Sequence, residues 1–247
     1  MLRVLTRRAI LAGALTAPLA GCGLGSGGEL IGGCRTPESL SSFETLGGAP
    51  MSYALTATKQ AFRADPRFFS LLDDWAFEWV DSSGFGALTE VVTYGAYVDK
   101  CDSWHAAGRA FDFAELRHET GSVSCRYDLW GDDQRQLRPY WRLAASLGSR
   151  FTYTLTYLYN EQHHNHIHID NAVSGAGPAS YDSRSKAQTQ LLQGVLRHVF
   201  GKDCATDGRL DTETKRAARE VQEQLRIEAR LASPEGWTAL LGAAARG

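Results

Sequence analysis

The sequence predicts an α+β fold, because stretches with the two-residue period of β-strands alternate along the chain with stretches of apolar residues at helical spacing. The strand pattern is clearest at residues 88–98 and 164–170, and the helical pattern at residues 68–80 and at three places beyond residue 185. A Ser-Gly-Ala-Gly-Pro run at 174–178 separates these last helices from the rest. A mixed first domain followed by a small three-helix domain is therefore expected.

Length, composition and charge are those of an ordinary globular protein. The 247 residues suffice for two domains, and 43% of them are hydrophobic and 22% charged. The formal net charge is −2, and because residues 1–21 contain three arginines and no acidic residue, the remainder carries −5. This balance argues against a nucleic-acid-binding protein. The oligomeric state stays open.

Residues 1–22 have the pattern of an export signal. Arg7 and Arg8 precede an apolar run that is too short to cross a bilayer, and export by the twin-arginine or the general route is open. The run ends in Leu-Ala-Gly-Cys, which resembles a lipobox, so Cys22 is expected to become a lipidated N-terminus facing the cell wall or periplasm. A plain secretory signal cleaved near Gly21 is the alternative. Residues 23–34 follow as a flexible spacer.

A helix and a strand are expected next. The large apolar side chains of residues 68–80 share one helical stripe, and we interpret them as core residues rather than as a sugar-binding platform. They are Phe68, Leu72, Trp75 and Trp79. Residues 88–98 then alternate as a strand that leads to the first candidate site.

Residues 103–113, read SWHAAGRAFDF, contain the first candidate metal ligands, His105 and Asp112. Small residues between the two leave room for a chain that crosses a metal. Phe111 and Phe113 alternate with Asp112, so on a strand the carboxylate faces one way and both rings face the other.

Three further elements are predicted between this stretch and the second candidate site. They are a strand at 123–129, a helix from Pro139 to Leu147 and a strand at 151–159. Proline is permitted in a first helical turn, where its missing amide proton is not needed. The last strand leads directly to the second stretch.

Residues 159–170, read YNEQHHNHIHID, supply the remaining candidates. His166, His168 and Asp170 share the two-residue period, with an isoleucine between each pair, so on a strand they face one site while the isoleucines enter the core. Imidazole and carboxylate in this number suit a borderline-soft divalent ion, zinc before manganese or cobalt.

A catalytic zinc site needs three protein ligands and one position left open for water. We predict that His105, Asp112 and His168 are the three ligands. A purely structural site is the alternative, although such sites are normally closed by four ligands.

The two stretches read SxHxxGxAxD followed by HxH, which resembles the zinc peptidases that include D-alanyl-D-alanine carboxypeptidases, lysostaphin-type endopeptidases and the hedgehog fold. Within that group, YNxxHxxHxHxD with a cysteine just before SxH is most similar to the bacterial extensin-like C-terminal family. The resemblance extends over residues 44–171. It implies a small antiparallel sheet with flanking helices that carries zinc on the three predicted ligands, with His166 as the catalytic histidine.

The chain departs from the related carboxypeptidases at two places. They have a glutamate three residues before the last ligand, where this chain has Asn165, and an arginine on the strand before SxH, which residues 91–100 lack. The role of the glutamate therefore falls to His166 or His163. The missing arginine favours an endopeptidase over a D,D-carboxypeptidase.

Three neighbours are expected to touch a ligand or the substrate. Asp170 continues the strand face and is placed to accept a hydrogen bond from a ligand histidine, with a strand-end cap as the alternative. Ser103 is either a contact of the site or a turn hydroxyl. Arg109 meets either a peptide carboxylate or solvent.

If the protein is exported, its remaining cysteines are expected to form disulfide bonds. Apart from Cys22 the chain has four cysteines, Cys34, Cys101, Cys125 and Cys204. In an oxidising compartment four cysteines allow three alternative sets of disulfide pairs. We favour Cys101–Cys125, because it closes a loop around the first metal stretch, and Cys34–Cys204 follows by exclusion. Thiolate ligation of the metal is disfavoured by the lack of a CxxC motif.

Residues 185–247, after a linker at 175–184, predict three short amphipathic helices. The stretch DGRLDTETKRAAREVQEQL, residues 207–225, is similar to the three-helix peptidoglycan-binding domain found beside cell-wall hydrolases. Asp211 stands where that family usually has glycine. A helical bundle without a ligand is the alternative.

Together these expectations describe a zinc metallopeptidase, anchored at the cell surface by lipid, that hydrolyses stem peptides or cross-links of peptidoglycan. Peptidoglycan and the membrane are its expected partners. The alternative is an inert zinc-containing lipoprotein that links membrane and wall, and loss of hydrolysis in a His166→Ala protein that keeps its metal distinguishes the two.

Overall fold

The computed structural model describes residues 30–31, 34–173, 175 and 177–247. The predicted export signal, the lipidation at Cys22 and nearly all of the spacer lie outside these residues. The fold is α+β, as predicted, with a large sheet and six α-helices in the described part of the chain. None of the described helices combines the length and the apolar character needed to cross a membrane.

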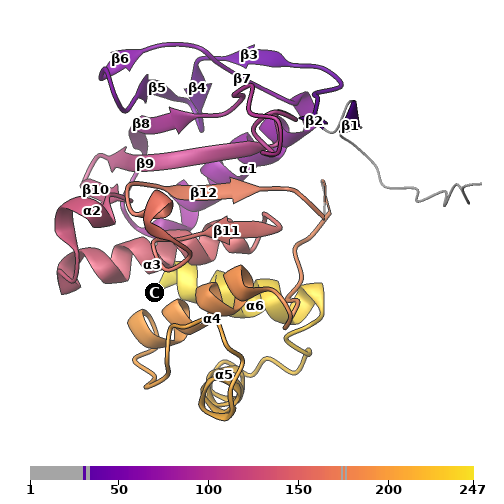
Figure 1. Ribbon diagram of the computed structural model, residues 1–247. Coiled ribbons are helices and arrows are strands. Elements are labelled where there is room, and N and C mark those ends of the chain that lie inside the picture. Colours follow the sequence, from indigo (N-terminus) through magenta and orange to yellow (C-terminus); the bar gives the residue numbers. More distant parts are fainter. Residues whose placement is uncertain (1–29, 32–33, 174, 176) are drawn as a thin grey trace, which may run out of the picture.

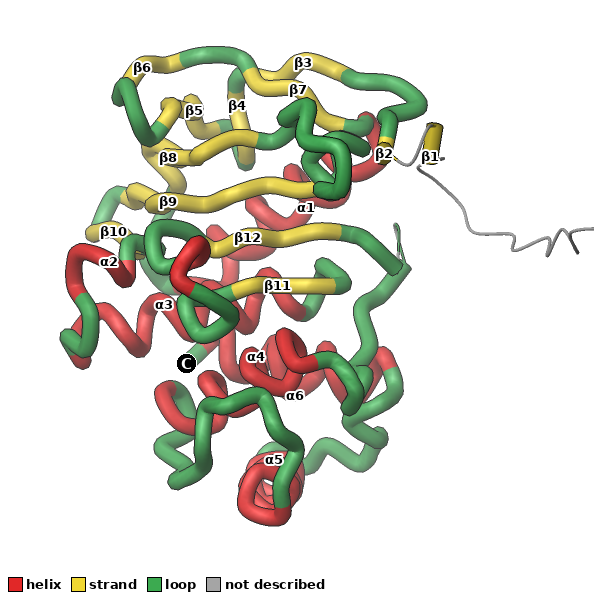
Figure 2. The backbone as a smooth tube through the Cα atoms, in the orientation of Figure 1, coloured by secondary structure: helices red, strands yellow, loops and turns green. Residues whose placement is uncertain are grey.

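The large sheet positions the candidate site. Its eight strands follow the path β11-β12-β9-β8-β5-β4, with β10 paired to β9 and β6 to β5 (Figures 1 and 2). All pairs are antiparallel except β5 with β8, so the sheet is mixed rather than purely antiparallel. The bounds are β4 Thr45–Leu46, β5 Ala49–Tyr53, β6 Thr58–Lys59, β8 Leu88–Gly95, β9 Ala110–His118, β10 Gly121–Ser124, β11 Tyr153–Leu155 and β12 Ile167–Asp170. Two small ribbons add β1 Leu30–Ile31 with β2 Cys34–Arg35, and β3 Ser41–Phe43 with β7 Phe62–Ala64.

Helix α1, Pro66–Ser83, contains the predicted apolar stripe, and all four side chains of the stripe are buried. Asp65 caps its N-terminus by accepting hydrogen bonds from the amides of Arg67 and Phe68, and Gly84 ends it in the left-handed conformation. The Trp75 ring meets Phe113 of β9 edge-on at 5.2 Å between centroids. The interpretation of these aromatics as core residues is therefore confirmed.

Three predicted elements between the candidate stretches are wrong in part. The strand at 123–129 ends at Ser124, and α2, Tyr127–Trp130, is helical, with the Tyr127 ring stacked on Tyr157 at 3.9 Å. Helix α3, Gln134–Gly148, begins earlier than Pro139 because Asp133 caps it, so the proline lies inside the helix. The predicted strand at 151–159 is shorter and consists of β11.

The three predicted C-terminal helices are present as α4 Lys186–His198, α5 Thr212–Gln224 and α6 Pro234–Arg246. They lie beyond β11 in Figure 1, with α4 packed on β11 and α3 and with α6 packed on α3 and α1. The Trp237 indole donates a hydrogen bond to the Gly148 carbonyl at 3.1 Å. One hydrophobic core thus runs from the sheet into these helices. The domain boundary at 175–184 stays a prediction.

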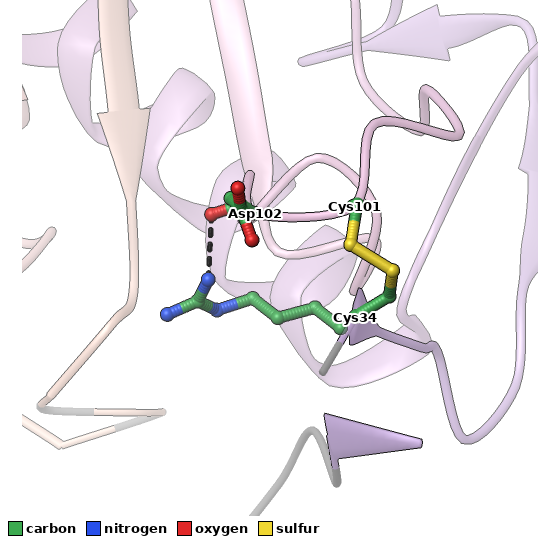
Figure 3. Close-up of a disulfide and its surroundings, with 4 residues drawn as sticks. Cys34, Cys101 and Asp102 are labelled. Carbon is green, nitrogen blue, oxygen red and sulfur yellow. Dashed lines mark hydrogen bonds between the residues drawn. A yellow bond between two sulfur atoms is a disulfide. The ribbon is translucent and has the colours of Figure 1, made fainter. Parts of the chain in front are cut away.

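The disulfide pairing predicted from sequence is wrong. Cys34 pairs with Cys101 (Figure 3). Cys125 and Cys204 are free thiols in the interior. Cys125 cannot reach Cys101 because it follows β10 and donates its amide proton to Ala114 of the central strand at 2.8 Å. Strand β2 instead runs beside the Cys101 loop, and the Arg35 amide donates to the Cys101 carbonyl at 2.9 Å.

Candidate metal centre

His105 lies in the loop between β8 and β9 and is fixed by three backbone contacts. Its Nδ1 is hydrogen-bonded to the carbonyl oxygen of Ala96. Its amide donates to Ser103 Oγ at 3.2 Å, and its own carbonyl accepts from the amide of Gly108 at 2.9 Å. Gly108 has φ of 68° and packs against Asp65, where a side chain would collide with the backbone. The loop is therefore held against the start of α1.

Asp112 and His168 lie side by side on adjacent strands of the sheet. They are register partners on β9 and β12, so their side chains project from the same face. The residues that alternate with them are fully buried on the other face: Phe111, Phe113, Ile167 and Ile169. The predicted separation of one chemical face and one core face is confirmed. Thr93 Oγ1 adds a hydrogen bond to the Asp112 carbonyl at 2.7 Å.

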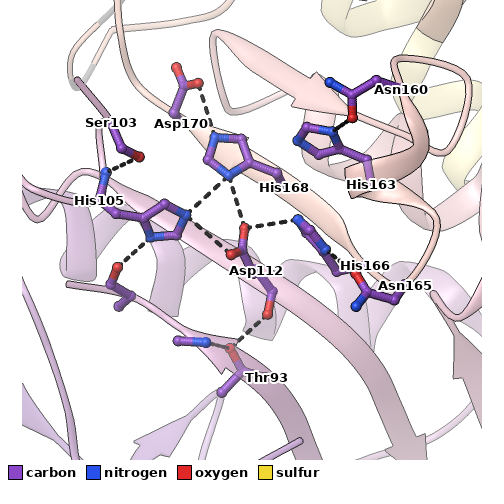
Figure 4. Close-up of polar contacts among 12 residues, drawn as sticks. Thr93, Ser103, His105, Asp112, Asn160, His163, Asn165, His166, His168 and Asp170 are labelled. Atoms are coloured by element: carbon purple, nitrogen blue, oxygen red, sulfur yellow. Dashed lines mark hydrogen bonds and ion pairs between the residues drawn. The ribbon is translucent and has the colours of Figure 1, made fainter. Parts of the chain in front are cut away.

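The three predicted ligands converge on one point (Figure 4). His105 Nε2 lies 3.2 Å from His168 Nδ1 and 3.2 Å from Asp112 Oδ2. His168 Nδ1 lies 2.8 Å from Asp112 Oδ1. Ligand atoms around a tetrahedral zinc ion are about 3.3 Å apart, given zinc–nitrogen bonds of about 2.0–2.1 Å. The donor set and its spacing fit zinc.

Proton placement on the two imidazoles determines which nitrogens can face a metal ion. The Ala96 carbonyl can only accept, so Nδ1 of His105 carries the proton and its Nε2 presents a lone pair. Asp170 Oδ2 lies 3.2 Å from His168 Nε2, so a neutral His168 with its proton on this nitrogen directs the lone pair of Nδ1 at the cluster. In that tautomer two imidazole lone pairs and a carboxylate meet, and a bound cation would satisfy all three.

The titration behaviour of Asp112 and His168 reflects the same convergence. Burial alone would raise the pKa of Asp112, but hydrogen bonds from His105 and His168 hold it far below its ordinary value. Burial would likewise lower the pKa of His168, yet Asp112 and Asp170 raise it to about 9. Without a metal, a proton on His168 therefore takes the place of the cation.

His166 and His163 lie on the remaining side of the cluster. His166 Nε2 is 3.5 Å from Asp112 Oδ1, and its Nδ1 is bonded to Asn165 Oδ1 at 2.6 Å. His163 Nδ1 is bonded to Asn160 Oδ1 at 2.7 Å, and its ring centre lies 5.1 Å from that of His166. With the amide oxygens accepting, both histidines keep Nε2 as a free base.

Both of these histidines are neutral at neutral pH. Burial lowers the pKa of His166. Burial, followed by repulsion from His166 and His168, lowers the pKa of His163 to about 3. With His168 they form a second group whose ligand atoms could hold an ion. The site therefore offers one firmly oriented ligand set with two uncharged bases beside it.

The three predicted neighbours differ in what they contact. Asp170 contacts His168 as described, and its other oxygen accepts from the Ala172 amide at 2.9 Å, so the predicted acceptor and the alternative cap are both present. Ser103 contacts His105 only through the backbone amide. Arg109 donates to the Asn171 carbonyl, and its guanidinium lies 5.1 Å from the Trp104 ring centre.

Several residues of the site escaped sequence reasoning. The Ala96 carbonyl is a backbone group, which no residue type can signal. Asn160 and Asn165 orient the two bases, and their spacing of three and one residues before His163 and His166 was the available signal. Tyr94 of β8 did not escape it, since the sequence suggests this residue either as a hydrogen-bond donor to an oxyanion or as a core residue; its ring centre lies 5.8 Å from that of His166, and burial raises its pKa.

Comparison with known proteins gives one match. Residues 94–179 match the family described as "Extensin-like protein C-terminus". No curated protein and no solved structure matches the chain. The matched segment runs from Tyr94 through both ligand strands and past Asp170, so it contains every candidate metal ligand and both candidate bases.

Proposed function

We propose that this chain is a zinc-dependent peptidase of peptidoglycan, exported and anchored to a membrane through lipid on Cys22. The observation that carries the proposal is the convergence of two oriented lone pairs and a carboxylate beside two neutral histidines. Three protein ligands with free bases next to them are the arrangement of a catalytic site, whereas a structural site is closed by a fourth ligand.

The bound zinc ion would supply Lewis acidity, polarising a scissile carbonyl and lowering the pKa of a water molecule. His166 acts as the general base, because its Nε2 is unprotonated and lies at the edge of the ligand cluster. Asn165 holds the ring in the tautomer that leaves this nitrogen free. The proton taken up by His166 is then available for the leaving amine.

His163 assists His166 rather than replacing it. Its Nε2 is a free base, and its low pKa keeps it uncharged, so it can hydrogen-bond the substrate or a water without adding charge next to the metal. Tyr159 packs edge-on against its ring at 5.4 Å and limits its movement. This pair of histidines takes the place of the glutamate found in the related carboxypeptidases.

The choice of substrate rests on the resemblance and on the export signal. The family match covers the whole site, and the predicted lipid anchor would hold the enzyme next to the wall. Cleavage within cross-links is favoured over removal of a terminal D-alanine, because no arginine lies on β8 to bind a free carboxylate. Release of D-alanine alone from a stem pentapeptide would contradict this preference.

The decisive test joins metal content to hydrolysis. Residues 23–247 are purified, their metals quantified, and isolated cell walls digested with and without a chelator, with the released fragments identified by mass spectrometry. One zinc per chain and chelator-sensitive peptide fragments are expected. A protein that holds zinc and cleaves no wall type would instead be the anchoring lipoprotein, and absence of bound metal would refute the site.

Mutation of the base separates catalysis from metal binding. His166→Ala is expected to lower kcat by about two to four orders of magnitude while leaving zinc content unchanged. His164→Ala is the matched control, because His164 belongs to neither ligand group and its ring packs on Tyr127. Equal activity of the two variants would rule out His166 as the base.

A further inference from the structure

A cleft of about 790 Å³ lies between β11, the segment 178–184 and helix α5. Thr152 and Tyr153 line its sheet side, and residues 230–232 close its far end. A cavity of this size accommodates a ligand of a few residues. No part of the function proposed above uses it.

The wall that α5 contributes is cationic. Lys215, Ala218, Arg219 and Gln222 follow one another at helical spacing and all line the cleft. Lys215, Arg219 and Arg230 are exposed, and none of the three has an ion pair within the described chain. On the same helix, Arg216 lies outside the cleft lining and is paired with Glu220 at 2.6 Å.

The cleft holds little negative charge to balance these cations. Its one lining carboxylate, Asp182, is paired with Arg184 at 3.1 Å. Three cationic groups therefore face the cavity uncompensated, in a chain whose overall net charge is −2. A ligand with carboxylate groups would supply the missing partners.

The interior surface between the cationic groups is apolar. Ala179, Tyr181 and Ala218 are buried in it, and Leu210 and Leu231 are half-buried at its sides. Such a surface accepts the hydrocarbon part of an extended chain, with charges at its rim. Carboxylates spaced along a short peptide match this combination better than a compact inorganic anion.

Tyr153 connects the cleft to the metal centre. It is the register partner of Asp170 on the neighbouring strand, so its side chain lies on the face that carries the metal ligands. It also lines the cleft. Burial raises the pKa of its phenol, with further contributions from Asp170 and Asp182, the carboxylates on its two sides. A peptide that extends out of the cleft past Tyr153 would thus pass next to Asp170 and His168.

We propose that the cleft binds carboxylate-bearing wall peptides and holds one part of the substrate while the next part reaches the metal centre. This inference rests on the proposed function, whose substrate recognition it assigns. Lys215, Arg219 and Arg230 pair with the carboxylates, and Tyr153 marks the exit of the chain toward the site.

Binding is measured by calorimetry with purified disaccharide-tetrapeptides and with the same compounds after amidation of their carboxylates. The double variant Lys215→Gln/Arg219→Gln is expected to bind about tenfold more weakly than the unmodified protein. Arg216→Gln/Arg226→Gln removes the same charge from α5 and its C-terminal end without touching the cleft, and should bind as the unmodified protein does. Amidation should abolish the difference between the two variants.

Hydrolysis provides the second readout. The cleft variant should raise KM for soluble wall fragments with kcat unchanged, since its residues are remote from the ligand cluster. Equal binding by the cleft variant and its control, or displacement of the peptide by equimolar inorganic phosphate, would overturn the proposal. Thermal unfolding midpoints of both variants verify that they are folded.

The two proposals fail in distinguishable ways. His166→Ala should lose hydrolysis and keep peptide binding in the cleft. Charge-dependent binding without hydrolysis of any wall type would uphold the cleft and refute the peptidase. Hydrolysis with normal KM in the cleft variant would uphold the peptidase and refute the cleft.

Discussion

Each ligand imidazole is oriented by a hydrogen bond on the nitrogen that faces away from the cluster. His105 uses the carbonyl of Ala96, and His168 uses the carboxylate of Asp170. These contacts hold both rings in place, so that less conformational freedom would be lost if the candidate site bound a metal. The two partners differ in charge, which makes the Asp170 contact the stronger of the two.

Replacement of Asp170 by asparagine is expected to weaken zinc binding by about tenfold to a hundredfold. The amide keeps the shape and can still cap Ala172, but it lacks the negative charge that increases the basicity of His168. Zinc affinity is measured by competition with a chromogenic chelator.

Asp99→Asn serves as the control for this change. Asp99 is exposed in the loop after β8 and makes no ion pair in the described part of the chain, so its replacement should leave zinc affinity unaltered. Equal affinities of the two variants would show that Asp170 is only a strand-end cap.

The convergence of the candidate ligands could be predicted because their chemistry coincides with strand alternation. Asp112 between two phenylalanines and His168 between two isoleucines reveal a polar face by sequence alone. The orienting groups could not be found in the same way, since Ala96 contributes only its backbone. The Cys34–Cys101 pairing also depended on β2, a two-residue strand too short to leave a periodic pattern.

Among the elements, α3 and α4 approach each other most closely where small residues meet large ones. Gly194 of α4 lies against the indole of Trp141, and a methyl group there would overlap the ring. Gly148 at the end of α3 is similarly covered by Leu191. These glycines explain how the C-terminal helices share a core with the sheet.

Gly194→Ala is expected to destabilise the protein by about 1–3 kcal/mol, because Trp141 must move to admit the added methyl group. Gly242→Ala is the matched control within α6, where the nearest atom to the new methyl group would be Arg246 Nη1 at 3.6 Å. Because alanine has the better helix propensity, this replacement should stabilise the protein by about 0.5–1 kcal/mol.

Urea unfolding of both variants measures these free energies. Opposite signs are expected, and equal effects would mean that the interface between α3 and α4 adapts freely.

Element boundaries were less predictable than element types. The strand pattern at 123–129 continued through Tyr127 and Leu129, yet the chain turns helical there so that the Tyr127 ring can stack on Tyr157. That contact joins residues thirty positions apart and has no local signal. The predicted start of α3 at Pro139 is wrong for a simpler reason: proline is typical of a first helical turn, whereas here Asp133 caps the helix earlier and Pro139 lies inside it.

For the molecule as a whole, His198 links stability to pH. Its ring stacks on Trp141 at 5.7 Å, and burial, followed by the nearby charge of Arg197, lowers its pKa to about 4, with Asp132 opposing. The unfolded chain has a histidine pKa of about 6.5. The unfolded state therefore binds more protons between these values, and stability falls as the pH decreases through this window.

His198→Gln should flatten this decline, because glutamine does not titrate. Urea midpoints of both proteins are compared at about pH 7.5 and about pH 4.5, which lie on either side of the ordinary histidine pKa. Between these two pH values the unmodified protein should lose more stability than the variant does. Parallel stability curves would show that His198 is equally protonated in both states.

The disulfide constrains the whole described N-terminal half. Cys34 and Cys101 are 67 residues apart, and chain-entropy estimates for such a loop give about 4 kcal/mol of stabilisation. Reduction should lower the free energy of unfolding by roughly this amount. The double variant Cys34→Ser/Cys101→Ser should be equally destabilised and, unlike the unmodified protein, should not respond to reductant.

The two buried thiols have a consequence for how the chain matures. In the unfolded chain Cys101 is nearer to Cys125 than to Cys34, and the shorter loop is entropically favoured by about 0.9 kcal/mol. Random oxidation would therefore trap the wrong isomer more often than the right one. Burial of Cys125, which also raises its pKa far above the ordinary value, removes the competing nucleophile. Correct oxidation thus requires that the β9–β10 hairpin form before the bond closes, or that an isomerase repair the product.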